Sequence, residues 1–247
     1  MRLATATCSK FPWVSDLPFT PETASLLKRC AVDEFGLADG KTDAWSNGSS
    51  EEFLGWLKQI GEKGDPDSTL ILFLATHQWG DGRTKFSSGS DLAPEKLIRA
   101  INEAAARYQR ILFINDGCYA SGLEKRGSFS DKVIRLYASG NDHPALDVNF
   151  DKGPYGLEEF AQKERLFLRS RMQWNPKGMS FLGLIGLKAA LSPREKSAAS
   201  LDLQTFMREM NRCRDLYNET VRQAKAQRLA LAPSDANFVI LKRSGSL

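Results

Sequence analysis

Residues 110–122 read RILFINDGCYASG, and they decide the fold. An apolar run from Ile111 to Ile114 stops at Asn115, and a cysteine follows at Cys118. A short, continuous apolar run of this kind is typical of a strand that is buried on both faces of a parallel sheet. Ligands of open α/β sheets gather at the carboxyl ends of such strands. The sequence therefore predicts that Cys118 lies where an α/β protein usually does its chemistry.

A second apolar run, from Leu70 to Ala75, ends in the same way, with His77 just past it. The segment between His77 and Cys118 is long enough for a loop, a crossover helix and a return strand, so the two strands can be neighbours. A nearby imidazole activates a thiol by taking its proton. We therefore predict that Cys118 is a nucleophile and His77 its base. The alternative is that each is an ordinary structural residue.

The composition is that of an ordinary soluble globular protein, with 42% hydrophobic and 26% charged residues among 247. The 34 basic and 30 acidic residues give a net charge of +4, which is too balanced to indicate a nucleic-acid or membrane partner. We see no signal peptide and no apolar run of membrane-spanning length. These features predict a cytoplasmic protein.

Four widely spaced cysteines, without a C-x-x-C pair, argue against a zinc site and a disulfide framework: Cys8, Cys30, Cys118 and Cys213. Residues 36–42 imitate a phosphate-binding loop, but they have one residue too few between their glycines and follow a predicted helix. There is no serine nucleophile elbow. An unrelated α/β hydrolase or nucleotide binder is therefore disfavoured, and we expect neither a cofactor nor a metal.

Strand and helix patterns alternate through the first half of the chain. The predicted strands are residues 2–7, 41–45, 69–76, 110–116, 132–139 and 238–242. The predicted helices are residues 20–35, 50–61, 92–108, 157–171, 180–191 and 201–228. This alternation predicts an α/β protein, a three-layer αβα sandwich around a mostly parallel six-stranded sheet. Residues 80–91, rich in glycine and serine, predict a mobile loop.

The segments TLILFLATHQWGDG (69–82) and ILFINDGCYASG (111–122) resemble the His and Cys blocks of the caspase-like cysteine peptidases. That family includes caspases, metacaspases and bacterial relatives. The D-x-C-x-x-S-G cluster is the most specific part. The His block departs from the family, because Gln78 and Trp79 stand where most members have glycine directly after the histidine. The resemblance implies one caspase-like domain over residues 1–247, with a C-terminal strand-and-helix part at 132–247.

The resemblance also implies a mechanism. Cys118 would form an acyl-enzyme, and backbone N–H groups would hold the developing oxyanion. Such donors are each worth roughly 3–4 kcal/mol when well placed. The candidates are the N–H of Cys118 and that of Gln78, the residue after the histidine. No Asp or Asn is obvious as a third catalytic member, and the family generally orients its histidine through a backbone carbonyl.

Asp116 lies two residues before Cys118, so both side chains point to the same side of an extended segment. A carboxylate in a substrate pocket calls for a cation, and Arg supplies a bidentate partner. Arg- or Lys-directed relatives carry Asp at this position, whereas Asp-directed caspases carry Gln. We therefore predict cleavage after Arg or Lys; the alternative is that Asp116 only caps a turn. The resemblance also implies that the segment at Ser139 lines the substrate pocket.

The expected partner is a protein or peptide substrate with a basic residue before the cleaved bond. The compact form looks like the stand-alone bacterial members. Several of those act in defence or cell death by cutting one dedicated target, such as a gasdermin-like protein. Lys125 and Arg126 are a hypothetical self-processing site, and His143 is expected to be solvated. The rival hypothesis is a non-catalytic caspase-like scaffold that binds a partner, and the irregular segment after His77 favours it.

Overall fold

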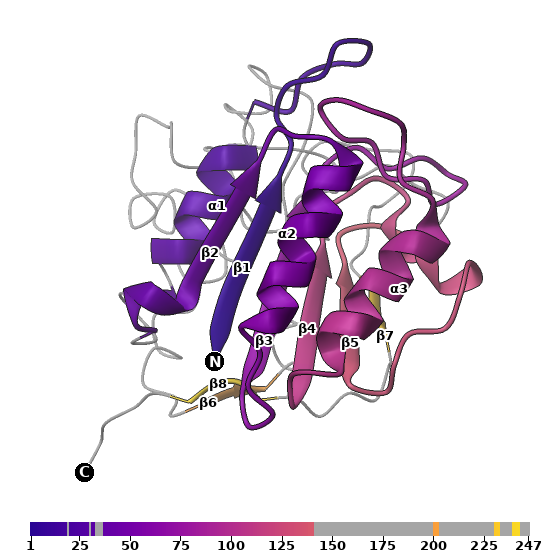
Figure 1. Ribbon diagram of the computed structural model, residues 1–247. Helices are drawn as coiled ribbons and strands as arrows, with labels where there is room; N and C mark the ends of the chain where they lie inside the picture. Colours follow the sequence, from indigo (N-terminus) through magenta and orange to yellow (C-terminus); the bar gives the residue numbers. More distant parts are fainter. Residues whose placement is uncertain are drawn as a thin grey trace, which may run out of the picture.

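The computed structural model describes residues 1–18, 20–29, 31–32, 37–140, 200–202, 230–232 and 239–242. Its main sheet has the strand order β2–β1–β3–β4–β5–β7 (Figure 1). The strands of this sheet are β1 (Arg2–Thr7), β2 (Thr42–Ser46), β3 (Thr69–Ala75), β4 (Arg110–Asn115), β5 (Val133–Tyr137) and β7 (Ala230–Ala232). The helices are α1 (Thr20–Arg29), α2 (Ser50–Glu62), α3 (Pro94–Ala105) and the short 3₁₀ turns η2 (Asp39–Lys41) and η3 (Ala120–Lys125).

Five neighbouring strands of this sheet, β2 to β5 in the sheet order, run parallel. The central strands β3 and β4 are buried along almost their whole length, as their continuous apolar runs predict. β3 and β4 are neighbours in the sheet, and this confirms the prediction on which the proposed position of the site depends. All five parallel strands present their carboxyl ends at one edge of the sheet, and the residues after β1, β3 and β4 meet there.

The sixth strand differs from the predicted one. It is β7, which pairs antiparallel to β5. The strand predicted at residues 238–242 exists as β8 (Val239–Lys242), but it pairs with β6 (Ser200–Asp202) in a separate two-stranded sheet. The helix predicted from residue 201 is therefore wrong at its start. Strands of three residues, as β6 and β7 are, fall below the length at which hydrophobic alternation is recognisable.

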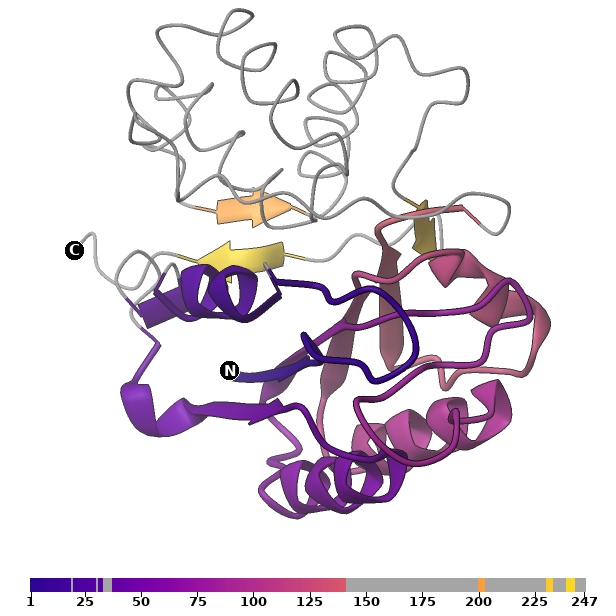
Figure 2. The same ribbon diagram turned by 90° about the horizontal axis from the view of Figure 1, so that it is seen from above.

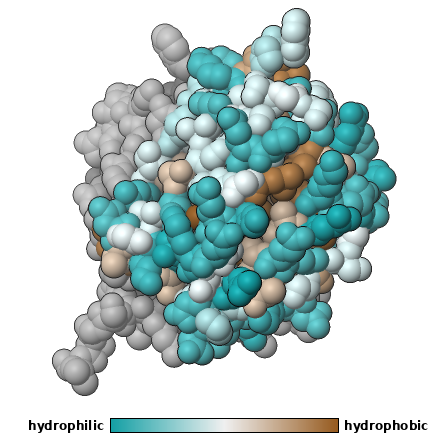
Figure 3. Space-filling view, in the orientation of Figure 1, coloured by the Kyte–Doolittle hydropathy of each residue, from teal (hydrophilic) through white to brown (hydrophobic). Residues whose placement is uncertain are grey.

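Helices lie on both faces of the sheet. α2 and α3 pack side by side on one face, and α1 lies on the other (Figures 1 and 2). α2 begins at a capping box, in which Ser49 and Glu52 each accept a hydrogen bond from the other's backbone N–H. The outward surface of α2 and α3 is mostly hydrophilic (Figure 3). Both helices therefore bury one apolar stripe and leave the opposite face to water.

The loop predicted to be mobile, residues 80–91, is anchored to the core instead. Phe86 is fully buried, and its ring lies 4.9 Å from that of Phe53 of α2. Thr84 forms bridges with Gln78 on one side and Leu92 on the other. A composition rich in glycine and serine indicates a loop, but one buried aromatic ring is enough to fix such a loop in place.

Several predictions fall outside the described residues. These are the helices at 157–171 and 180–191, the rest of 201–228, the structural roles of Cys30 and Cys213, and the solvation of His143. Within the described part of the chain, no helix combines the length and the apolar character needed to cross a membrane.

Candidate active site

The His and Cys segments leave the sheet side by side. In the register of β3 and β4, Leu74 pairs with Asn115, and the N–H of Asp116 donates to the carbonyl of Leu74 at 2.8 Å. His77 and Cys118 each stand three residues beyond this pair. Parallel strands thus deliver the imidazole and the thiol to the same edge of the sheet, which is the edge where α/β proteins bind ligands.

A direct contact joins the two segments just beyond the strands. The side-chain amide of Gln78 accepts a hydrogen bond from Asn115 at 2.9 Å and donates to the carbonyl of Gly82 at 3.3 Å. A Cβ at Gly117 would lie 3.1 Å from the Gln78 amide oxygen and 3.2 Å from its Cβ. Only glycine therefore fits at 117 without displacing Gln78. Because Gln78 follows His77 and Gly117 precedes Cys118, this contact fixes the two catalytic candidates on adjoining pieces of backbone.

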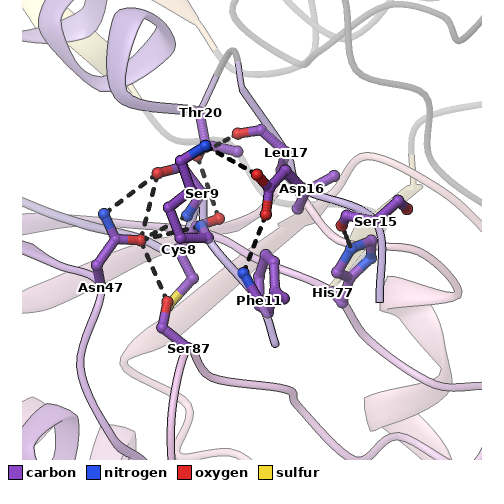
Figure 4. A network of polar contacts seen from close by, with 11 residues as sticks. Cys8, Ser9, Phe11, Ser15, Asp16, Leu17, Thr20, Asn47, His77 and Ser87 are labelled. Carbon is purple, nitrogen blue, oxygen red and sulfur yellow. Dashed lines mark hydrogen bonds and ion pairs between the residues drawn. The ribbon is translucent and has the colours of Figure 1, made fainter. Parts of the chain in front are cut away.

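The imidazole of His77 is oriented by the loop between β1 and α1. Its Nε2 lies 2.7 Å from the carbonyl oxygen of Ser15 (Figure 4). A carbonyl only accepts, so Nε2 carries the proton and Nδ1 is left with the lone pair. The ring of Phe11 packs against the imidazole, with centroids 4.7 Å apart. This matches the backbone-carbonyl orientation that the family resemblance implies for the histidine.

The orienting loop is itself held at several points (Figure 4). The side-chain oxygen of Asn47 accepts from the N–H groups of Ser9 and Lys10 at 2.7 and 3.2 Å and from the Ser87 hydroxyl at 3.1 Å. The Asp16 carboxylate accepts from the N–H of Phe11 at 3.1 Å. A hydrogen bond from Lys10 holds the pKa of Asp16 below its usual range. The sequence shows this segment only as a loop with two prolines.

The residues that follow His77 form a tight hairpin rather than a disordered insertion. The N–H of Trp79 donates to Arg83 and that of Lys85 to His77, both at 2.9 Å. These two hydrogen bonds lie on either side of the antiparallel pair of Gln78 and Thr84. In such a pair, the N–H of Gln78 points away from the opposite segment. Gly82 closes the turn at φ +87°. The departure from the family's His block is therefore accommodated by regular hydrogen bonding.

Cys118 sits on a sharp turn at the end of β4. It is half-buried, and the next residue, Tyr119, has the left-handed backbone conformation, with φ 53° and ψ 25°. The chain then enters η3. A non-glycine residue in this conformation is costly and is retained only where its surroundings hold it. The turn presents the cysteine at the edge of the sheet instead of letting β4 continue.

The burial pattern before the cysteine agrees with the alternation that the sequence predicts. Burial alternates along this segment: Asn115 and Gly117 are buried, whereas Asp116 and Cys118 are half-exposed. Asp116 and Cys118 therefore both stand at partly exposed positions, in contrast to the buried residues before and between them. Ser139, by contrast, is fully buried, and its hydroxyl bonds to Gly117 and Ala120 of the cysteine turn.

A partly exposed ion pair supports the short 3₁₀ turn after the cysteine. Both carboxylate oxygens of Glu124 in η3 accept from Arg135 of β5 at 3.0 Å, and the Tyr137 hydroxyl also donates to Glu124. Burial raises the pKa of Glu124, but the hydrogen bonds from Arg135 and Tyr137 outweigh it and leave that pKa below its usual range. Lys125 and Arg126, the hypothetical self-processing site, are exposed at the end of this braced turn.

The lowered pKa of Glu124 makes the stability of this region depend on pH. Its contribution is fully present above the pKa of an unfolded glutamate and is lost as the pH falls through the lower pKa of the folded state. We expect Glu124→Gln to flatten the pH dependence of the free energy of unfolding below about pH 4.5. Urea unfolding of both proteins between pH 6 and 3 measures this. Glu103→Gln, at an exposed position of α3, is the control; equal slopes for all three proteins would contradict the expectation.

Within the described residues, no group of three or more His, Cys, Asp or Glu side chains has the arrangement of a metal site. Cys8, the other described cysteine, is fully buried, and this burial raises the pKa of its thiol. Of the described cysteines, only Cys118 therefore has the exposure that a nucleophile needs.

Comparison with solved structures identifies the fold. The crystal structure of caspase-1 from Spodoptera frugiperda matches with a TM-score of 0.61. The chain has a caspase-like fold. The match covers 100% of this chain and 91% of that one, at 12% sequence identity. No protein-family model matches the sequence, and no curated protein matches it either. The caspase-like fold accounts for the parallel sheet whose carboxyl edge carries His77 and Cys118.

Proposed function

We propose that this protein is a cysteine endopeptidase that cuts protein substrates after Arg or Lys. The observation that carries the proposal is the junction at the carboxyl edge of the sheet. There the residue after His77 packs against the residue before Cys118, and the Ser15 carbonyl holds the imidazole. A thiol and an oriented imidazole on adjoining segments are the requirement for thiol-based acyl transfer.

The chemistry follows from the proton on His77. With Nε2–H donated to Ser15, the Nδ1 atom accepts the proton of the Cys118 thiol, and the thiolate attacks the substrate carbonyl. The tetrahedral intermediate collapses as the imidazolium returns that proton to the leaving amine. Water, deprotonated by the same imidazole, then hydrolyses the thioester and releases the acid and the thiol. In each step, one proton is transferred to or from the Nδ1 atom of His77.

The oxyanion of the intermediate needs N–H donors, and we propose those of Cys118 and Gln78. The hairpin after His77 turns the N–H of Gln78 away from Thr84, which leaves it available on the other side. The side chain of Gln78 is 3% exposed and lies beneath Gly117, so it does not occupy the place where a substrate would bind. Two preorganised donors lower the barrier because they need no rearrangement during the reaction.

Asp116 is the proposed specificity residue. Like Cys118, it is partly exposed, and it stands two residues before that cysteine, where we propose that a bound substrate makes contact. A half-buried carboxylate attracts a guanidinium or ammonium group more strongly than a fully solvated one does. The substrate is accordingly a protein segment with Arg or Lys before the cleaved bond. A cytoplasmic role in bacterial defence, with one dedicated target such as a gasdermin-like effector, rests on the family resemblance.

A non-catalytic scaffold is the competing proposal, and an irreversible thiol probe with an Arg recognition element separates the two. If the protein is an enzyme, mass spectrometry should find the label on Cys118, and His77→Ala should slow labelling at least 100-fold. His143→Ala, which removes the other histidine, is the matched control and should label at the wild-type rate. A Cys118 labelling rate that is the same with and without His77 would favour the scaffold.

A further inference from the structure

The hydroxyl of Ser139 spans the turn that carries Cys118. It donates to the carbonyl of Gly117 at 3.0 Å and accepts from the N–H of Ala120 at 3.1 Å. One of these partners precedes Cys118 and the other follows Tyr119. The backbone carbonyl of Ser139 adds a third contact, accepting from the N–H of Ser121 at 3.3 Å. A single residue beyond β5 thus holds the backbone on both sides of the cysteine.

The turn needs such a brace because its backbone is strained. Tyr119 has φ 53°, a left-handed conformation that side chains with a Cβ avoid. Without outside support, Tyr119 would relax toward an ordinary conformation and swing the preceding Cys118 with it. The two hydrogen bonds of Ser139 close the turn in the strained form, and they are made in a fully buried position where water does not compete.

The same facts remove Ser139 from direct contact with a substrate. Its side chain is 0% exposed, and the hydroxyl both donates to and accepts from the cysteine turn. We infer that Ser139 is a positioning residue, which sets the reactivity of Cys118 by holding residues 117–120 in place. The inference deepens the proposed peptidase function, but the positioning itself is measurable on the thiol without any substrate.

Alkylation of Cys118 by iodoacetamide, mapped by mass spectrometry at several pH values, tests this. Ser139→Ala is expected to slow alkylation of Cys118 at least tenfold near neutral pH. Ser50→Ala is the matched control, since Ser50 is also buried and its hydroxyl donates at 3.1 Å to the carbonyl of Ser90, away from the turn. The control should stay within twofold of the wild-type rate, and all proteins are compared well below their melting temperatures.

A pair of equal-volume substitutions keeps the test valid if removal of the hydroxyl unfolds the protein. Ser139→Thr retains the hydroxyl, whereas Ser139→Val has the same shape without it. We expect alkylation in the Thr variant to be at least tenfold faster than in the Val variant. Rates within twofold of each other, or a Ser139→Ala rate equal to that of the control, would overturn the inference. If the wild type cleaves no peptide yet its alkylation depends on Ser139, the peptidase proposal fails and the positioning role stands.

Discussion

Replacing Cys118 by alanine is expected to reduce kcat/KM on Arg-containing peptides by at least roughly 10⁴-fold, because the acyl-enzyme can no longer form. His77→Ala should cost at least roughly 10³-fold, since the thiol then keeps its proton at neutral pH. The double variant should be little worse than Cys118→Ala alone, as the two groups act in one step. Fluorogenic peptides with Arg before the cleaved bond provide the measurement.

Cys8→Ser is the control for this loss. Cys8 is the first residue of the loop between β1 and α1, but it is fully buried and its raised pKa keeps it protonated. Its replacement removes a sulfur without touching the chemistry, so activity per folded molecule should persist. Hydrolysis by Cys118→Ala above about one hundredth of the wild-type rate would show that another group is the nucleophile.

Asp116→Ala is expected to lower kcat/KM for Arg and Lys peptides by roughly 10²–10³-fold, the usual effect of removing one partner of a desolvated charge pair. Asp116→Asn keeps the shape and should lose nearly as much, because the charge provides the attraction. The wild type should prefer Arg and Lys over Leu and Asp before the cleaved bond. Kinetics on four peptides that differ only at this residue give the answer.

The control for this effect is Asp131→Asn, at an exposed position before β5. Labelling of Cys118 by a small uncharged thiol reagent should also be unchanged in Asp116→Ala, since the nucleophile and its base remain. A wild-type preference for Asp peptides would contradict the pocket assignment. So would an equal loss by Asp116→Ala on Leu and Arg peptides, which would make Asp116 a structural cap of the turn.

The sequence predicts the central strands and the sheet edge that carries the candidate site, because both depend on side-chain patterns. The apolar runs of β3 and β4 identify buried parallel strands, and the polar residues after them identify the edge. The alternation before Cys118 predicts which side chains share the open side. The sequence does not predict β6 or β7, because a strand of three residues is too short to show an alternating pattern. Its pairing also depends on residues that are far away in the sequence.

The supports of the candidate site are not visible in the sequence for a different reason. His77 is oriented by the carbonyl of Ser15, and every residue has a backbone carbonyl, so no residue type marks the partner. The amide pair of Gln78 and Asn115 joins a residue beyond the end of β3 to the last residue of β4. Ser139 follows a strand end and was expected in a substrate pocket, yet its burial and its bonds to the turn emerge only once β5 lies beside β4. Such contacts are set by tertiary packing.

The strand order has a consequence for the protein during its synthesis. β1 lies between β2 and β3, and Arg2 pairs with Leu70, so β1 is synthesised well before its partner β3. Until β4 follows, β3 presents an unpaired apolar edge, and such edges promote aggregation. The loop that orients His77 is therefore synthesised before His77 itself, and Cys118 is synthesised after both. A nascent chain that ends before residue 110 exposes the unpaired edge of β3 but lacks Cys118, the candidate nucleophile.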